Sequence, residues 1–150
     1  MNISTKLPQL FLRLSLGVGF IVPILDRLSQ LGLPGEKNIS WGSWENFIDY
    51  TSMLMPFLNR PLVNVMGSIA TILELIIGIA LILGIKTRLA AFGSFGLTLT
   101  FAICMAIFLG FKAPINYSVF PVCAGSLLLA AIQTHEWSVD QYFLSSHKIT

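Results

Sequence analysis

The residue best placed to do chemistry is a single carboxylate, Glu74, in a long apolar stretch. It is the one charged residue between positions 62 and 85. A carboxylate in the middle of a membrane is costly unless it is paired, hydrated or protonated. Ionisable groups in such places often mark proton relays, ligand sites or ion pathways. The alternative is a structural role, in which the carboxyl hydrogen-bonds a neighbouring helix and fixes the packing.

Arg13 is the cation that the sequence offers as a partner for Glu74. Counted from one side of the membrane, Arg13 lies about 9 Å deep and Glu74 about 16 Å deep, at about 1.5 Å per helical residue. An arginine side chain spans much of that difference if the two helices are neighbours, as consecutive antiparallel helices usually are. We therefore predict an intramembrane polar pair, Glu74 with Arg13, as the catalytic site. In the alternative, Arg13 extends to the cytoplasmic headgroups.

Two further residue pairs are candidates for a functional site. Asp26 and Arg27 end the first apolar segment, shortly after Pro23. A proline kink beside two charges can shape a pocket mouth on the outer side, although such charges more often only mark a helix end. Cys104 and Cys123 lie at similar depth in the third and fourth segments and could cycle as a dithiol. Cysteine in a membrane helix is more often a small apolar residue.

Four apolar segments must position these groups: residues 7–28, 62–85, 89–111 and 113–132. About 20 helical residues cross a bilayer core of about 30 Å. The segments are continuously apolar, whereas membrane strands alternate. Hydrophobic residues make up 55% of the chain and charged residues 11%, too few charges for a soluble surface. We predict an all-α, polytopic four-helix bundle in the lipid bilayer, forming a single domain over residues 1–150.

The connection over residues 29–61 is longer and more polar than the others. Trp41, Trp44 and Phe47 in it, spaced among acidic residues, predict a short amphipathic helix on the membrane surface. A packed loop with aromatic anchors is the alternative. An even number of spans places both termini on one side, and the lysine and arginine of the turn after residue 85 favour the cytoplasm.

Two sequence features concern helix packing. Small residues recur at every fourth position of the third segment and indicate close helix contacts, with a homo-oligomer face as the alternative. Pro121, near Asn116 and Ser118, can break the fourth helix locally.

Composition and motifs exclude several classes of protein. A net charge of +2 with no basic tract argues against nucleic-acid binding. Two cysteines without a CxxC pair form neither a disulfide framework nor a zinc site. The histidines, His135 and His147, follow the last span, so a bis-histidine haem between the helices is excluded. We expect no metal and no covalently held cofactor, so a redox cofactor must be diffusible, such as a quinone, or belong to a partner protein.

Two blocks of sequence resemble the DoxX/DoxD family of small bacterial membrane proteins. The first block contains Leu12-Arg13-Leu14, Gly17, Phe20 and the pair Arg27-Leu28. The second and more specific block is LELIIGIALILGIKTRLAA, which includes Glu74 and Gly78. The resemblance covers the first three segments, and the fourth agrees mainly in hydropathy. The first helix in the family usually ends in a glycine-lysine pair, where this chain has Asp26 and Arg27.

The resemblance implies a multi-pass four-helix bundle in the bacterial cytoplasmic (inner) membrane. Some members of the family form or resemble the membrane subunit of a thiosulfate:quinone oxidoreductase, others are associated with oxidative-stress complexes, and related animal proteins act as membrane chaperones. A quinone-linked oxidoreductase subunit or a component of an oxidative-stress complex is therefore the first hypothesis. A non-catalytic assembly factor or partner-binding protein is the alternative, and transport of a small anion is the third.

Overall fold

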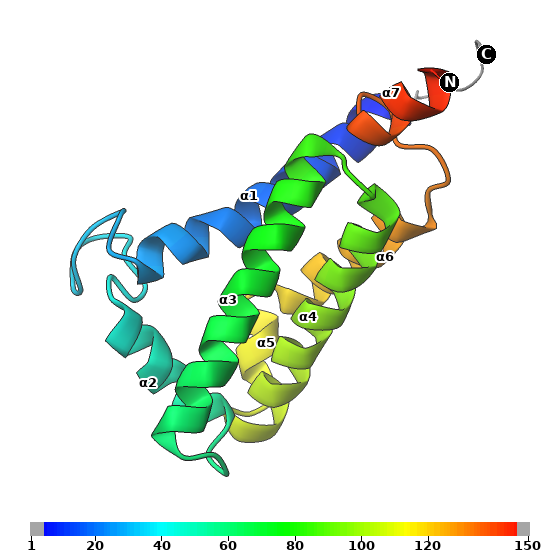
Figure 1. The fold of residues 1–150 in the computed structure, drawn as a ribbon. Coiled ribbons are helices and arrows are strands. Elements are labelled where there is room, and N and C mark those ends of the chain that lie inside the picture. The colour runs from blue at the N-terminus through cyan, green and yellow to red at the C-terminus, as the bar shows by residue number, and fades with distance from the viewer. Residues whose placement is uncertain (1–4, 147–150) are drawn as a thin grey trace.

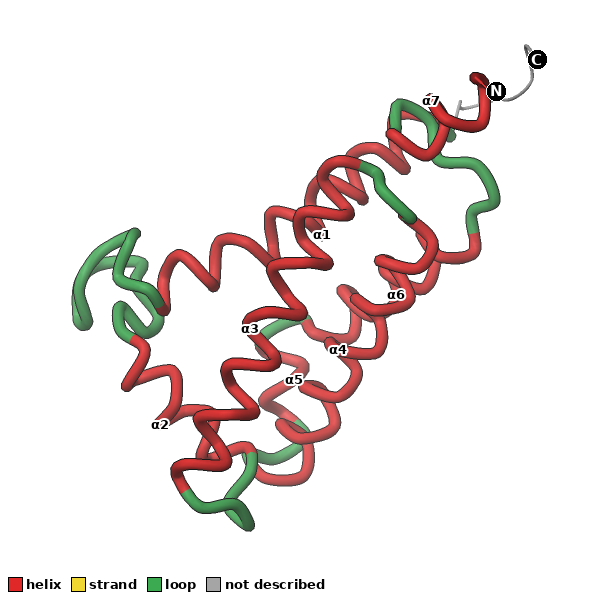
Figure 2. The backbone as a smooth tube through the Cα atoms, viewed as in Figure 1, coloured by secondary structure: helices red, strands yellow, loops and turns green. Residues whose placement is uncertain are grey.

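The computed structural model describes residues 5–146, and over this range the chain forms helices and no strands (Figures 1 and 2). The all-α prediction is thus confirmed. The helices are α1 (Lys6–Arg27), α2 (Trp44–Leu54), α3 (Arg60–Leu83), α4 (Thr87–Phe108), α5 (Lys112–Asn116), α6 (Val119–Ala131) and α7 (Val139–Ser146).

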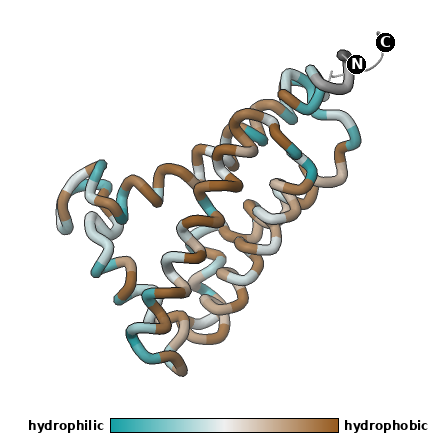
Figure 3. The backbone as a smooth tube through the Cα atoms, in the orientation of Figure 1, coloured by the Kyte–Doolittle hydropathy of each residue, from teal (hydrophilic) through white to brown (hydrophobic). Residues whose placement is uncertain are grey.

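Three helices, α1, α3 and α4, are long and apolar enough to cross a membrane. They correspond to the first three predicted spans. Many of their large apolar side chains are exposed, as in Phe11, Ile76 and Leu89. In Figure 3 the hydrophobic colour dominates these helices, while hydrophilic residues gather in the connections at their ends. Outward-facing apolar side chains on long helices are what a lipid environment requires.

The fourth predicted span, residues 113–132, forms two helices, α5 and α6, and its crossing of a membrane stays a prediction. The chain turns at Tyr117 and Ser118 between α5 and α6, and Ser118 has a left-handed φ of 53°. Pro121 is the cause, since its ring would clash with the carbonyl of residue 117 if the helix continued. The predicted local break at this proline is confirmed. With 13 residues, α6 is shorter than the roughly 20 residues that cross a bilayer.

The connection between α1 and α3 contains the predicted short helix, α2. Ser43 caps its N-terminus by accepting a hydrogen bond from the Asn46 backbone N–H at 3.2 Å. Its buried face includes Phe47 and Ile48, which pack on Val63 of α3. The helix is therefore fastened to the bundle, and its position on a membrane surface stays a prediction.

The described ends of the chain meet at one end of the molecule, beside the turn between α3 and α4 (Figure 1). Lys6 forms an ion pair with Glu136 at 3.5 Å. Asp140 of α7 accepts hydrogen bonds at 2.7 Å from the backbone N–H groups of Lys86 and Thr87, and so caps α4. Burial works to raise the pKa of Asp140, but the hydrogen bonds from Thr87 and Lys86 outweigh it and hold this pKa below its usual value. The side of the membrane that this end faces stays a prediction.

Helices α1 and α3 touch where each has a glycine. A Cβ placed on Gly17 would lie 2.6 Å from Ile82 Cγ1 and 3.0 Å from the carbonyl oxygen of Gly78. Small residues allow this close approach in lipid. Beyond the contact the two helices diverge, and α2 lies across the open side (Figure 1). The glycine contact therefore fixes the register of α1 against α3. It also leaves a space between the two helices where they diverge beyond the contact.

The small residues of α4 face α6. Ser94 and Ser126 are buried and share a hydrogen bond of 2.6 Å. Ala90 and Ala102 are buried on the same stripe. These positions confirm that the stripe serves packing within the chain.

We predict that Gly17→Leu will destabilise the protein, because the new side chain must displace backbone as well as side-chain atoms of α3. Overpacking of this kind costs about 1–3 kcal/mol, seen as a lower thermal unfolding midpoint in detergent. The matched control is Gly96→Leu on α4, where no atom lies within 4 Å of an added Cβ. Equal midpoints for the two variants would contradict the close approach of α1 and α3.

Candidate functional site

Glu74 forms a buried ion pair with Arg27 at the end of α1. The distance from Arg27 Nη2 to Glu74 Oε2 is 2.8 Å, and the side chains are only 2% and 9% exposed. Attraction between opposite charges is strong where water is excluded, and either group alone would be costly to bury.

Arg27 makes further contacts that connect three helices. Its Nε donates to the Pro23 carbonyl at 3.1 Å within α1, and its Nη1 donates to Thr71 Oγ1 of α3 at 2.8 Å. Its guanidinium carbon lies 4.0 Å from the ring centre of Phe47 on α2 and 5.3 Å from that of Trp41. A cation over aromatic faces is stabilised by their negative potential. Arg27 thus holds α1, α2 and α3 in one arrangement.

Asp26, the neighbour of Arg27, organises the loop that follows α1. Its carboxylate accepts hydrogen bonds at 3.1 Å from the backbone N–H groups of Ser40, Trp41 and Gly42. These bonds place the Trp41 ring beside Arg27. The two charges therefore do more than mark a helix end, since Asp26 positions the loop and Arg27 pairs with the buried carboxylate.

The predicted pairing of Arg13 with Glu74 is wrong. Arg13 is buried at the other end of α1, where Nη2 donates to the Trp137 carbonyl at 2.8 Å and Nη1 to the Glu136 carbonyl at 3.4 Å. The reason is the register of the antiparallel helices. Arg13 lies opposite Gly84, where an added Cβ would stand 2.7 Å from its Nη1. A catalytic role for Arg13 or Glu74 stays a prediction.

Cys104 and Cys123 are both free thiols. Cys123 is buried, and its thiol donates to Thr98 Oγ1 at 3.3 Å. This contact joins α6 to α4 and gives Cys123 a packing role. The dithiol hypothesis stays a prediction.

A cavity of about 790 Å³ lies beside the ion pair, in the space where α1 and α3 diverge. Residues of α1, α2, α3, α4 and α6, of the loop before α2 and of the turn between α5 and α6 line it. Six aromatic side chains line it: Phe20, Trp41, Phe47, Tyr50, Phe101 and Tyr117. Arg27, Glu74 and Pro23 also line it, whereas Asp26 does not. The cavity thus combines flat apolar surfaces with one buried pair of charges.

Tyr50 and Tyr117 bring hydroxyl groups to this cavity. Burial raises the pKa of Tyr50 above its ordinary value, and the nearby Tyr117 raises it further. The Tyr50 phenol therefore stays protonated at neutral pH and is available as a hydrogen-bond donor.

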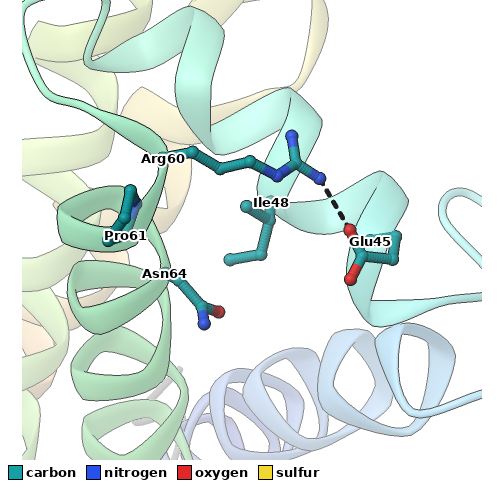
Figure 4. Close-up of a pocket in the computed structure, with 5 residues that line it drawn as sticks. All are labelled: Glu45, Ile48, Arg60, Pro61 and Asn64. Carbon is teal, nitrogen blue, oxygen red and sulfur yellow. Dashed lines mark hydrogen bonds and ion pairs between the residues drawn. The ribbon is translucent and has the colours of Figure 1, made fainter.

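Surface contacts also join α2 to α3. Arg60 lies between Glu45 and Asp49, at 2.6 Å and 2.5 Å, and lines a smaller hollow of about 320 Å³ (Figure 4). Trp44 Nε1 donates to Asn64 Oδ1 at 2.8 Å nearby. Exposed ion pairs contribute little individually, so the buried aromatic face of α2 supplies most of the attachment.

Several residues of the cavity, and Thr71 beside the ion pair, were not assigned to a site from the sequence. The signal that could find Trp41, Tyr50 and Tyr117 is aromatic character near the end of a span. Thr71 has no such signal, because a threonine in a membrane helix usually bonds its own backbone. The bond from Thr71 Oγ1 to the Gly67 carbonyl at 2.8 Å is of this kind.

Long apolar helices that enclose a buried ion pair and a cavity define a helical membrane protein with an internal polar site. The model of the DoxX family matches residues 9–111, from within α1 to just beyond α4. The match includes Arg27 and Glu74, and the chain belongs to the DoxX family. Searches of curated proteins and of solved structures gave no match.

We predict that Arg27→Gln and Glu74→Gln will each destabilise the protein, by up to roughly 3–5 kcal/mol, because each leaves a buried partner unpaired. The double variant should lose less than the sum of the two single losses, measured by unfolding in detergent. Glu36→Gln is the matched control, because Glu36 is exposed in the loop. Additive losses would show that the pair is not energetically coupled.

Proposed function

We propose that this DoxX-family protein is the membrane component of a quinone-linked oxidoreductase, with the cavity beside Arg27 and Glu74 as its quinone site. The supporting observation is the aromatic lining of that cavity around a buried ion pair. Cavities for small ligands are typically about 300–1,000 Å³, mostly apolar, with a few placed polar groups. A quinone has a flat ring and an oxygen at each end, which suits both parts of the lining.

The residues of the cavity suit the proton chemistry of such a ligand. A bound quinone supplies two-electron, two-proton redox chemistry. Glu74 would exchange a proton with the ring oxygen nearest to it, and Arg27 would stabilise negative charge that develops there. Tyr50 would donate a hydrogen bond to the ligand from α2. Each group lines the cavity, so none has to move far to act.

The electrons would come from a partner protein, since we propose no electron-carrying group within this chain. Thiosulfate oxidation is the partner reaction that the family resemblance favours. In it, two thiosulfate ions join through a new sulfur–sulfur bond and release two electrons, which pass to the quinone with two protons from solvent. An oxidative-stress complex is another setting for the same quinone site.

We also propose a multi-pass protein of the bacterial cytoplasmic membrane with both termini in the cytoplasm. The α5–α6 pair would complete a fourth crossing. The cytoplasmic side would then carry Lys86, Arg88 and the contact of Asp140 with the start of α4, in line with the excess of positive charge on that side. The cavity and α2 would lie toward the outer side.

A non-catalytic role in assembly or partner binding is the second candidate. One observation favours it: Arg27 contacts Pro23, Thr71 and Glu74, which are all residues of the same chain. An arginine used in this way is sufficient as a structural fastener between helices. In that case a protein partner, and no quinone, would accompany the purified protein.

We predict that Gly19→Leu will weaken quinone binding without unfolding the protein. Gly19 lines the cavity, and no atom lies within 4 Å of an added Cβ. A leucine there projects into the cavity. It also removes a helix-interior glycine, which favours the folded state by roughly 0.5–1 kcal/mol. Equilibrium dialysis of a short-chain benzoquinone against the protein in detergent should show binding weakened at least about tenfold.

Gly96→Leu is the matched control for this experiment. It makes the same change on α4, also in open space but outside the cavity, and should leave quinone binding unchanged. Unchanged binding in Gly19→Leu would exclude this cavity as the site. A wild-type protein that binds no quinone and carries a stoichiometric protein partner would favour the assembly role.

A further inference from the structure

Pro23 leaves one backbone carbonyl of α1 without its helical donor. In an α-helix the N–H of residue 23 bonds the carbonyl of residue 19. Proline has no N–H, and Pro23 lies inside α1. The carbonyl oxygen of Gly19 therefore lacks the backbone N–H that would normally donate a hydrogen bond to it within the helix. A backbone carbonyl without its helical donor is tolerated within a membrane when another donor forms a hydrogen bond to it.

The Gly19 carbonyl lies on the face of α1 that borders the cavity. Gly19 and Pro23 are one helical turn apart, and both line the cavity. Gly19 has no side chain, and the space around its Cβ position is open. The next carbonyl of this row, that of Pro23, is already taken by Arg27 Nε at 3.1 Å. The acceptor left open to a ligand is thus the one at Gly19.

Arg27 is committed elsewhere and does not serve this acceptor. Its Nη1 donates to Thr71, and its Nη2 contacts Glu74. Among residues 5–142, whose side chains the structure describes, none donates a hydrogen bond to Gly19. The carboxylate of Glu74 on the same cavity is itself an acceptor. This part of the cavity therefore presents hydrogen-bond acceptors, which suit a ligand that donates a hydrogen bond.

We infer that the cavity recognises a ligand hydroxyl through the Gly19 carbonyl, and so binds the hydroxyl-bearing, reduced ring of a hydroquinone more tightly than the oxidised quinone. This rests on the proposed function and adds to it the redox form that the site prefers. The ring oxygens of a quinone only accept hydrogen bonds, so an acceptor on the protein repels them. A hydroquinone donates a hydrogen bond there. Tighter binding of the reduced form makes reduction of the bound quinone more favourable.

Pro23→Ala tests this directly, because alanine restores the N–H that pairs with the Gly19 carbonyl. Binding of a soluble benzoquinone, its hydroquinone and the hydroquinone dimethyl ether is measured without oxygen, by calorimetry in detergent. Wild-type protein should bind the hydroquinone more tightly than the ether. The variant should bind the hydroquinone about fivefold more weakly, the loss of one net hydrogen bond. Its preference for the hydroquinone over the ether, measured as the ratio of the two affinities, should therefore fall by about the same factor. Alanine favours helix over proline, so the variant remains folded.

Pro61→Ala is the matched control. Pro61 lies in the first turn of α3 and outside the cavity, where an N–H has no helical acceptor. It should leave all three affinities unchanged. Equal wild-type affinity for hydroquinone and ether, or an equal loss for all three ligands in Pro23→Ala, would overturn the hydroxyl inference and keep the quinone site. Wild-type protein that binds none of the three would overturn both proposals.

Discussion

A buried pair of opposite charges is the constraint on which the rest of this structure depends. Neither Arg27 nor Glu74 can be left alone in apolar surroundings, so α1 must present its last turn to the middle of α3. The aromatic rings of Phe47 and Trp41 then cover the guanidinium and bring α2 and its loop onto the bundle. Asp26 secures the same loop through three backbone N–H groups. One ion pair thereby sets the relative positions of three helices.

The cavity results from how α1 and α3 meet. They are in contact at Gly17 and Gly78, where no side chain separates the backbones, and they diverge toward Arg27 (Figure 1). Side chains of α2, α4 and the α5–α6 turn reach the opened space and line it with aromatic rings. Because the Arg27–Glu74 pair beside the cavity is buried, its charges act strongly on a ligand that reaches them. The groups required for folding are therefore the same ones that the proposed chemistry uses.

Hydropathy and aromatic spacing predicted much of the fold, because both depend on the contact of each residue with lipid or water. The three long spans, the helix at Trp44 and the break near Pro121 follow from such local properties. Glu74 stood out for the same reason. Its partner, Arg27, could not be identified in this way, because pairing depends on the register of two helices. The Gly17 contact sets that register. That register brings Arg27 to Glu74 and carries Arg13 to the carbonyls of Glu136 and Trp137.

The most direct test of the quinone site is to map where a photoreactive azidobenzoquinone attaches to the purified protein. Crosslinked peptides are identified by mass spectrometry. If the cavity is the site, adducts should fall on Trp41, Tyr50 and Tyr117, which come from three separate segments and all line it. An excess of unmodified benzoquinone should suppress them. Adducts confined to outward-facing residues such as Phe11 and Leu89, unaffected by the competitor, would contradict a quinone site beside Arg27 and Glu74.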